Sequence, residues 1–182
     1  MSHPQADATS RQGRLDALRQ QLAESQDGIL EALAVQHSLS LLEVVSCLPR
    51  HCWQRVSGEH FVEVLGELAD WGALTTIVHT PDVILEYGGP FPEGKLGHGF
   101  YNLQGGHALG GHLKPDRCAA IVFLRRPFMG LETASVQFFN EEGDAMFKVY
   151  LGRDEARWLR ADQLERFTAL GQRLASAEAV GS

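Results

Sequence analysis

Apolar positions in the first 72 residues recur at the three- and four-residue spacing of amphipathic helices. Four helices are predicted, with apolar stripes formed by Leu15, Leu18 and Leu22; by Ile29, Leu30 and Leu33; by Leu42, Val45 and Cys47; and by Phe61, Val64, Leu65 and Leu68. Asp27 is expected to cap the second helix. Ser40 and Glu43 have the spacing of a capping box that opens the third, and Gly72 is expected to end the fourth.

Between residues 73 and 152 the pattern changes to short β-rich runs separated by turn residues. The runs are LTTIVHT, DVILEYG, GFYNLQG, HALGGHLK, CAAIVFL, TASVQFF and AMFKVYLG. Because no helical pattern separates them, they are typical of antiparallel strands in a meander or Greek key. The run CAAIVFL is apolar on both faces and is expected to be a central strand, whereas AMFKVYLG alternates and is expected to be covered mainly on one side.

A last helix is predicted to begin at Asp154 and to turn an apolar stripe toward the sheet, formed by Trp158, Leu164, Phe167, Leu170 and Leu174. The predicted fold class is therefore α+β: an antiparallel sheet of about seven to nine strands, flanked by N-terminal helices and a C-terminal helix. We expect one domain at 14–176, with a helical part at 14–72, the sheet at 73–152 and the helix at 154–176. Residues 1–13 are expected to be a disordered lead-in.

Charge and composition narrow the classes of function. A net charge of -7 counts against a nucleic-acid binder and against docking on an anionic membrane surface. No stretch of the chain is long and apolar enough to predict membrane insertion. The polar N-terminus lacks the pattern of a secretion signal, and Cys47, Cys52 and Cys118 cannot all pair within the chain. A reducing cytoplasm is the expected compartment.

Half of the eight histidines lie between residues 79 and 112, among many glycines; they are His79, His98, His107 and His112. Imidazole and phenolate are both axial ligands of heme iron, and glycines let a flat ligand approach the strands closely. A zinc site is the alternative, but the spacing of these histidines matches neither H-E-x-x-H nor a Cys/His finger. Because residues five apart on a strand point to opposite faces, only one of His107 and His112 is expected to reach such a ligand.

The residues give less support to two other classes of function. No G-x-S-x-G elbow, P-loop or dinucleotide fingerprint is present, which lowers the expectation of an enzyme. The segment LEALAVQHSLSLLEVVSCL has the outline of a helix-turn-helix. However, residues 40–47 contain no Lys or Arg and carry Glu43, so a helical cap on the sheet or a dimer contact is favoured over DNA binding.

Longer strings resemble a known family. LLEVV, WGALTTIVHTPDVILE, HGFYNL, GHLK, CAAIVFLRRPFMG and SVQFFNEEGDAMFKVYLGRDE together resemble the HutX/ChuX-like heme-utilisation carriers over about residues 30–174. The resemblance implies a fold like half of the larger two-repeat heme-trafficking proteins. It also implies a homodimer that receives imported heme and passes it to a heme-degrading partner.

The resemblance also implies candidate ligands for the heme iron. Family histidines associated with heme lie in the VHT and GH-x-K strings, which here contain His79 and His112. Other members are thought to use a tyrosine in the string H-G-aromatic-aromatic-N-L. Here that string begins at His98, carries Phe100 at the first aromatic position and has Tyr101 at the second, so Tyr101 is the oxygen-ligand candidate.

The sequence thus predicts an intracellular heme carrier, with a heme-degrading enzyme and a helix-turn-helix regulator as alternatives. Because heme carries two propionates, its site needs cations, and those flanking the histidine-rich region are Lys95, Lys114, Arg117, Arg125 and Arg126. Replacing His79 or His112 is expected to weaken hemin binding more than replacing His107.

Overall fold

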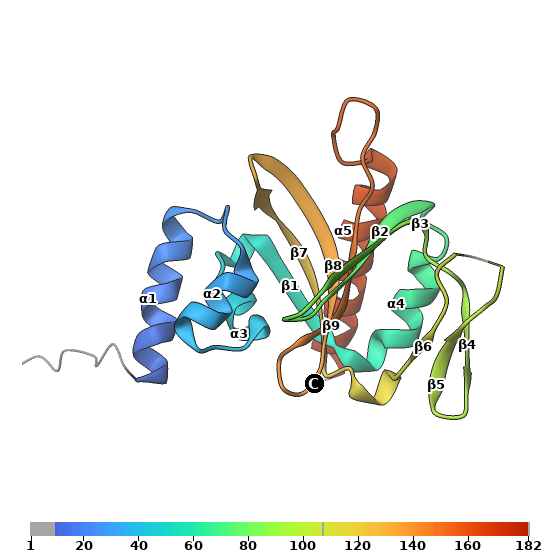
Figure 1. Cartoon of the computed structure of the whole chain (residues 1–182), viewed down its shortest axis with the longest axis horizontal. Helices are drawn as coiled ribbons and strands as arrows, with labels where there is room; N and C mark the ends of the chain where they lie inside the picture. The colour runs from blue at the N-terminus through green and yellow to red at the C-terminus, as the bar shows by residue number, and fades with distance from the viewer. Residues whose placement is uncertain (1–9, 107, 182) are drawn as a thin grey trace, which may run out of the picture.

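The computed structural model describes residues 10–106 and 108–181, so residues 1–9 of the expected lead-in lie outside the described residues. The helices are α1 (Arg11–Glu24), α2 (Leu30–His37), α3 (Leu41–Ser46), α4 (Phe61–Leu68) and α5 (Ala161–Val180). The strands are β1 (Trp53–Ser57), β2 (Ala73–His79), β3 (Ile84–Pro90), β4 (Gly94–Gly97), β5 (Phe100–Leu103), β6 (His112–Leu113), β7 (Ala120–Phe128), β8 (Leu131–Phe139) and β9 (Ala145–Tyr150). The α+β fold class is confirmed (Figure 1).

The strands form two antiparallel sheets rather than one. The larger has six strands in the order β1-β7-β8-β9-β2-β3, and the smaller has three in the order β4-β5-β6. Strand β7, which begins within the run CAAIVFL, lies between β1 and β8, and its residues from that run are buried on both faces, as their apolar pattern predicts. None of the helices within the described ranges is long and apolar enough to cross a membrane.

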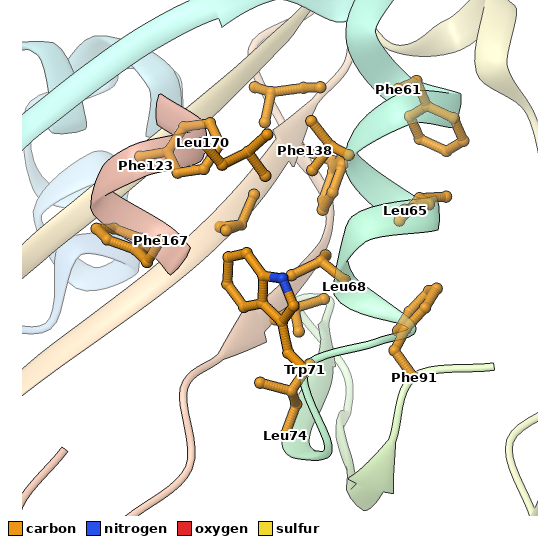
Figure 2. Close-up of a cluster of buried hydrophobic side chains, with 14 of the residues drawn as sticks. Phe61, Leu65, Leu68, Trp71, Leu74, Phe91, Phe123, Phe138, Phe167 and Leu170 are labelled. Atoms are coloured by element: carbon orange, nitrogen blue, oxygen red, sulfur yellow. The ribbon is translucent and has the colours of Figure 1, made fainter. Parts of the chain in front are cut away.

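Helices α4 and α5 cover one face of the larger sheet (Figure 2). The predicted stripe on α4 is buried, and the aromatic rings of Phe61, Phe138 and Phe147 meet there with centroids 4.5–6.2 Å apart. Such contacts add to the apolar burial that holds the helices on the sheet.

Helices α1, α2 and α3 cover the other face, over Val122, Leu124 and Phe139. The capping box is confirmed, because the Ser40 hydroxyl accepts from the Glu43 backbone N–H while the Glu43 carboxylate accepts from that of Ser40. Helix α3 has six residues, and its apolar side is buried against this face of the sheet. The segment with the outline of a helix-turn-helix therefore caps the sheet.

The smaller sheet is attached to the core on the α4 side. Tyr101 is 3% exposed and meets the Phe61 ring edge-on, and Leu103 and Leu113 pack against the same cluster. The Tyr101 ring also lies so close over Gly94 that a Cβ there would come within 2.1 Å of it. Glycine at this position therefore lets the first strand of the smaller sheet approach the core.

Three expectations for the N-terminal half are corrected. Helix α1 begins at Arg11 with Ser10 as its N-cap, so the ordered chain starts earlier than residue 14. The Asp27 carboxylate does not cap α2; it accepts hydrogen bonds from the backbone N–H groups of Met129 and Gly130 instead. Strand β1 lies within the part expected to be helical, where its five residues pair with β7.

The C-terminal helix begins at Ala161 rather than at Asp154. The Asp154 carboxylate accepts from the Trp158 N–H and closes a loop in which Arg157 has a φ of 67°. Trp158 is consequently 71% exposed, so the prediction that it faces the sheet is wrong. Among residues 108–114 of the run HALGGHLK, the strand is limited to His112–Leu113, and β4 was not predicted.

Candidate functional site

One face of the three-stranded sheet gathers aromatic, imidazole and ammonium side chains. Lys95 pairs with Asn102 across β4 and β5, and Asn102 pairs with His112 across β5 and β6. Directly opposed residues share a face, and so do residues two apart along a strand. This surface, formed by Lys95, Phe100, Asn102, His112 and Lys114, is called the His112 face. The alternate residues, Tyr101 and Leu113 among them, face the core.

His112 is held in place while its ring stays exposed. Its Nδ1 lies 2.7 Å from the Asn102 Oδ1, and its ring meets Phe100 edge-on with centroids 5.8 Å apart. A histidine that ligates a metal generally has its other ring nitrogen bonded to an oxygen acceptor. The contact at Nδ1 therefore leaves Nε2 as the nitrogen with which His112 would bind iron.

Two of the five cations expected to serve the propionates belong to the His112 face. Lys114 Nζ lies 5.6 Å from the centre of the Phe100 ring, and Lys95 is exposed on β4. The other three are engaged elsewhere: Arg117 pairs with Glu142, Arg125 pairs with Glu132, and Arg126 donates to the carbonyls of Gln26 and Gly28. Lys95 and Lys114 are thus the expected cations that lie beside an exposed imidazole.

The surroundings of the His112 face leave room for a flat ligand. A Cβ atom added at Gly110 or Gly111 would meet nothing within 4 Å, and a hollow of about 310 Å³ beside Phe100 is lined by Gly97 and Gly99. His98 is exposed between these two glycines, in the turn between β4 and β5, with a φ of 53°. His98 therefore belongs to a turn of the smaller sheet that carries His112, and it is not part of a paired strand.

Tyr101 points away from this face. Strand alternation places Phe100 with Asn102 and His112, and it turns Tyr101 into the core. Burial raises the pKa of Tyr101 above its ordinary value, which disfavours the phenolate that would bind ferric iron. The first aromatic position of the H-G-aromatic-aromatic-N-L string is the outward one, and this chain carries Phe100 there.

His79 lies in a different environment, at the end of β2 and beside α2. Its Nδ1 is 3.3 Å from the Glu31 carboxylate, which also pairs with Lys148. His79 and Glu31 border a cavity of about 680 Å³ whose lining includes Asp144 and apolar residues of α2. Burial by itself would raise the pKa of Glu31, but attraction to the Lys148 ammonium and their hydrogen bond outweigh it, so this pKa lies below its usual value.

The structure does not bring the candidate residues together at one point. In Figure 1, α2 and β6 lie on opposite sides of the central strands, so the His79 cavity and the His112 face are separate within one chain. The cavity is lined by the carboxylates of Glu31 and Asp144, and the Lys148 ammonium that contacts Glu31 is already paired with it. The cavity is therefore the poorer place for two propionates. His107, the expected comparison residue, lies outside the described residues.

Sequence reasoning missed the residues that hold the two histidines, namely Asn102, Glu31 and Lys148. Alternation along β5 could have placed Asn102 on the face of Phe100, but its pairing with His112 depends on the strand register. Glu31 reaches His79 and Lys148 only through packing of α2 against the sheet, and no local pattern signals that contact.

Comparison with known proteins identifies the family of the chain. A sequence model described as haem utilisation ChuX/HutX matches residues 54–170. The intracellular heme transport protein HutX of Vibrio cholerae serotype O1 is 39% identical over 163 residues, covering 87% of this chain and 84% of the relative. The solved structure of the heme binding protein ChuX is 44% identical, with a TM-score of 0.80, covering 87% of this chain and 99% of that chain.

A more distant structure bears on the fold alone. Apo-PhuS, a heme-binding protein from Pseudomonas aeruginosa, is 18% identical with a TM-score of 0.73, and the match covers 93% of this chain and 50% of PhuS. The expected likeness to half of a larger two-repeat protein is thereby confirmed, and the fold is of this α+β class. Within that class, the chain belongs to the ChuX/HutX family of haem utilisation.

Proposed function

We propose that this protein is a cytoplasmic heme carrier that binds heme on the His112 face. The observation that carries the proposal is an exposed imidazole with its Nδ1 held by an oxygen, beside an aromatic ring and two lysines. His112 Nε2 binds the iron, the macrocycle lies over Phe100, and Lys95 and Lys114 attract the propionates. The names of the relatives, intracellular heme transport protein and heme binding protein, support the same ligand.

Transfer to a heme-degrading partner, rather than degradation by this chain, follows from the openness of the site. Oxygen chemistry on heme is helped by a closed pocket that excludes water and prevents side reactions. The His112 face instead leaves its imidazole and both ammonium groups exposed, which suits uptake and release. In this proposal His98 lies at the edge of the heme site. His79 belongs to the separate cavity beside Glu31, and Tyr101 is a core residue that does not bind the iron.

The carrier and the enzyme are distinguished by giving the heme-loaded protein an electron donor and oxygen in the presence of catalase. Catalase is needed because free peroxide destroys heme without an enzyme. We expect the Soret band to persist, and a heme-degrading partner added afterwards to take up the heme. Stoichiometric loss of the band with release of iron or a tetrapyrrole, before any partner is added, would contradict the carrier.

A homodimer is proposed as the working state. Strand β3 is an edge of the larger sheet, and the exposed side chains at and before its start include Val83, Ile84 and Leu85. An apolar sheet edge of this kind is normally covered or paired. Light scattering at micromolar concentration is expected to give twice the chain mass of 20.0 kDa. A particle of the single-chain mass across that range would contradict the dimer.

A further inference from the structure

The side-chain amide of Asn102 is fixed by the hairpin that carries it. Its Nδ2 donates to the backbone carbonyls of Lys95, Gly97 and Phe100 at 3.2, 3.1 and 3.3 Å. An amide turned the other way would place its own oxygen against these three carbonyls, where no hydrogen is available for a bond. The donor end of Asn102 therefore faces β4 and the start of β5, and the acceptor end faces β6.

This orientation dictates the tautomer of His112. The Asn102 Oδ1 has no hydrogen to donate, so the contact at 2.7 Å requires a proton on His112 Nδ1. In the neutral ring the lone pair then lies on Nε2. The edge-on contact with Phe100 further restrains the plane of the ring. Two neighbours on the same sheet face, Asn102 and Phe100, thus fix both the proton and the direction of the free nitrogen.

We propose that Asn102 is the positioning residue for His112: it selects the Nδ1–H tautomer and aims Nε2 at the iron, which deepens the proposed function and rests on it. Asn102 does not touch the iron. Its hydrogen bond orients the imidazole, as outer-shell acceptors do in other metal sites. The competing explanation is that Asn102 only stabilises the β4–β5 hairpin, since its amide donates to three backbone carbonyls of that hairpin.

Two substitutions separate these roles. Asn102→Ala removes both the acceptor for His112 and the donor for the carbonyls. Asn102→Asp keeps an acceptor for His112 Nδ1 but, as a carboxylate, cannot donate to the carbonyls. A positioning role therefore predicts that Asp rescues what Ala loses, whereas a purely structural role predicts that Asp is at least as damaging as Ala.

The first readout needs no heme. Nitrogen-15 NMR of the neutral His112 ring in the apo-protein is expected to show the Nδ1–H tautomer in the wild type and in Asn102→Asp. In Asn102→Ala we expect the ring to move to the Nε2–H form that imidazole prefers in water. Since this measurement is made without ligand, it tests the hydrogen bond even if the wild type were to bind no hemin, a result that would defeat the proposed function instead.

The second readout is the rate of heme loss to an acceptor protein. Asn102→Ala is expected to lose heme roughly 10–100-fold faster than wild type, with a shifted ferrous iron–histidine stretch, while Asn102→Asp stays near wild type. In a His112→Ala background, Asn102→Ala should add little. The proposal is overturned if Asn102→Ala keeps the wild-type tautomer, if Asp fails to rescue, or if the Asn102 effect is equally large without His112.

Discussion

His112→Ala is expected to cause the largest loss of heme retention among single substitutions in this chain. It removes the Nε2 ligand while leaving Phe100, Lys95 and Lys114 in place. The rate of heme loss should rise by more than the roughly 10–100-fold that losing an outer-shell partner costs a metal site. The Soret band should shift as well, because the axial ligand has changed. Stopped-flow transfer to an acceptor protein, followed by absorbance, measures both effects.

His51→Ala is the matched control, since His51 is exposed in the short turn before β1 and belongs to neither candidate site. It is expected to keep the wild-type spectrum and rate. His79→Ala should have a smaller effect than His112→Ala, because His79 borders the Glu31 cavity. If Tyr101→Phe alone shifts the band and speeds heme loss, while both histidine variants resemble wild type, the ligand assignment is wrong.

Among substitutions at the two candidate sites, Glu31→Ala is expected to produce the largest loss of folding stability. The Lys148 side chain is 7% exposed, and the substitution leaves its ammonium without the carboxylate that it contacts. Breaking a buried pair from one side costs about 3–5 kcal/mol, and we expect about 3 kcal/mol because Glu31 is itself partly exposed. The melting temperature should fall by roughly 6–12 °C for a chain of this size.

Thermal and urea unfolding measure this effect, with Glu142→Ala as the control. Glu142 forms a comparable ion pair with Arg117, but on the exposed surface, where little change in stability is expected. Glu31→Ala should also leave the rate of heme loss unchanged once the protein is folded, since its cavity is separate from the His112 face. Wild-type unfolding behaviour in Glu31→Ala would contradict the buried pair.

The pH dependence of this loss has a definite sign. Because the folded-state pKa of Glu31 is lowered relative to its ordinary value of 4.5, the pair contributes fully above that value. Its contribution is lost as the pH falls through the lower folded-state pKa, where the carboxylate takes up a proton. The difference in unfolding free energy between wild type and Glu31→Ala should therefore be constant at neutral pH and shrink in acid.

The elements that the sequence predicts well are those whose burial follows a simple period. The stripe on α4, the capping box at Ser40 and the central strand β7 were all predicted, because each is determined by neighbouring residues. Strand β1 was missed since its five residues give little alternation. The spacing of Trp158 predicts a helical position, whereas the Asp154 carboxylate accepts a hydrogen bond from the Trp158 N–H and closes a loop there.

The candidate site was predictable by residue type but not by partner. Its histidines and the two useful lysines follow from composition and resemblance, but their arrangement depends on tertiary structure. Alternation alone would have set Tyr101 opposite to Phe100; deciding which of them faces the core required the packing against Phe61. The separation of His79 from His112 arises because their strands belong to different sheets, which no local pattern reveals.

Titration of the apo-protein with hemin tests the central claim most directly. We expect saturation near one hemin per chain, with a Soret band distinct from that of free hemin, and loss of that spectrum in His112→Ala but not in His51→Ala. Failure of the wild type to bind at micromolar hemin, or a His112→Ala variant that binds with the wild-type spectrum and affinity, would contradict a heme site on the His112 face.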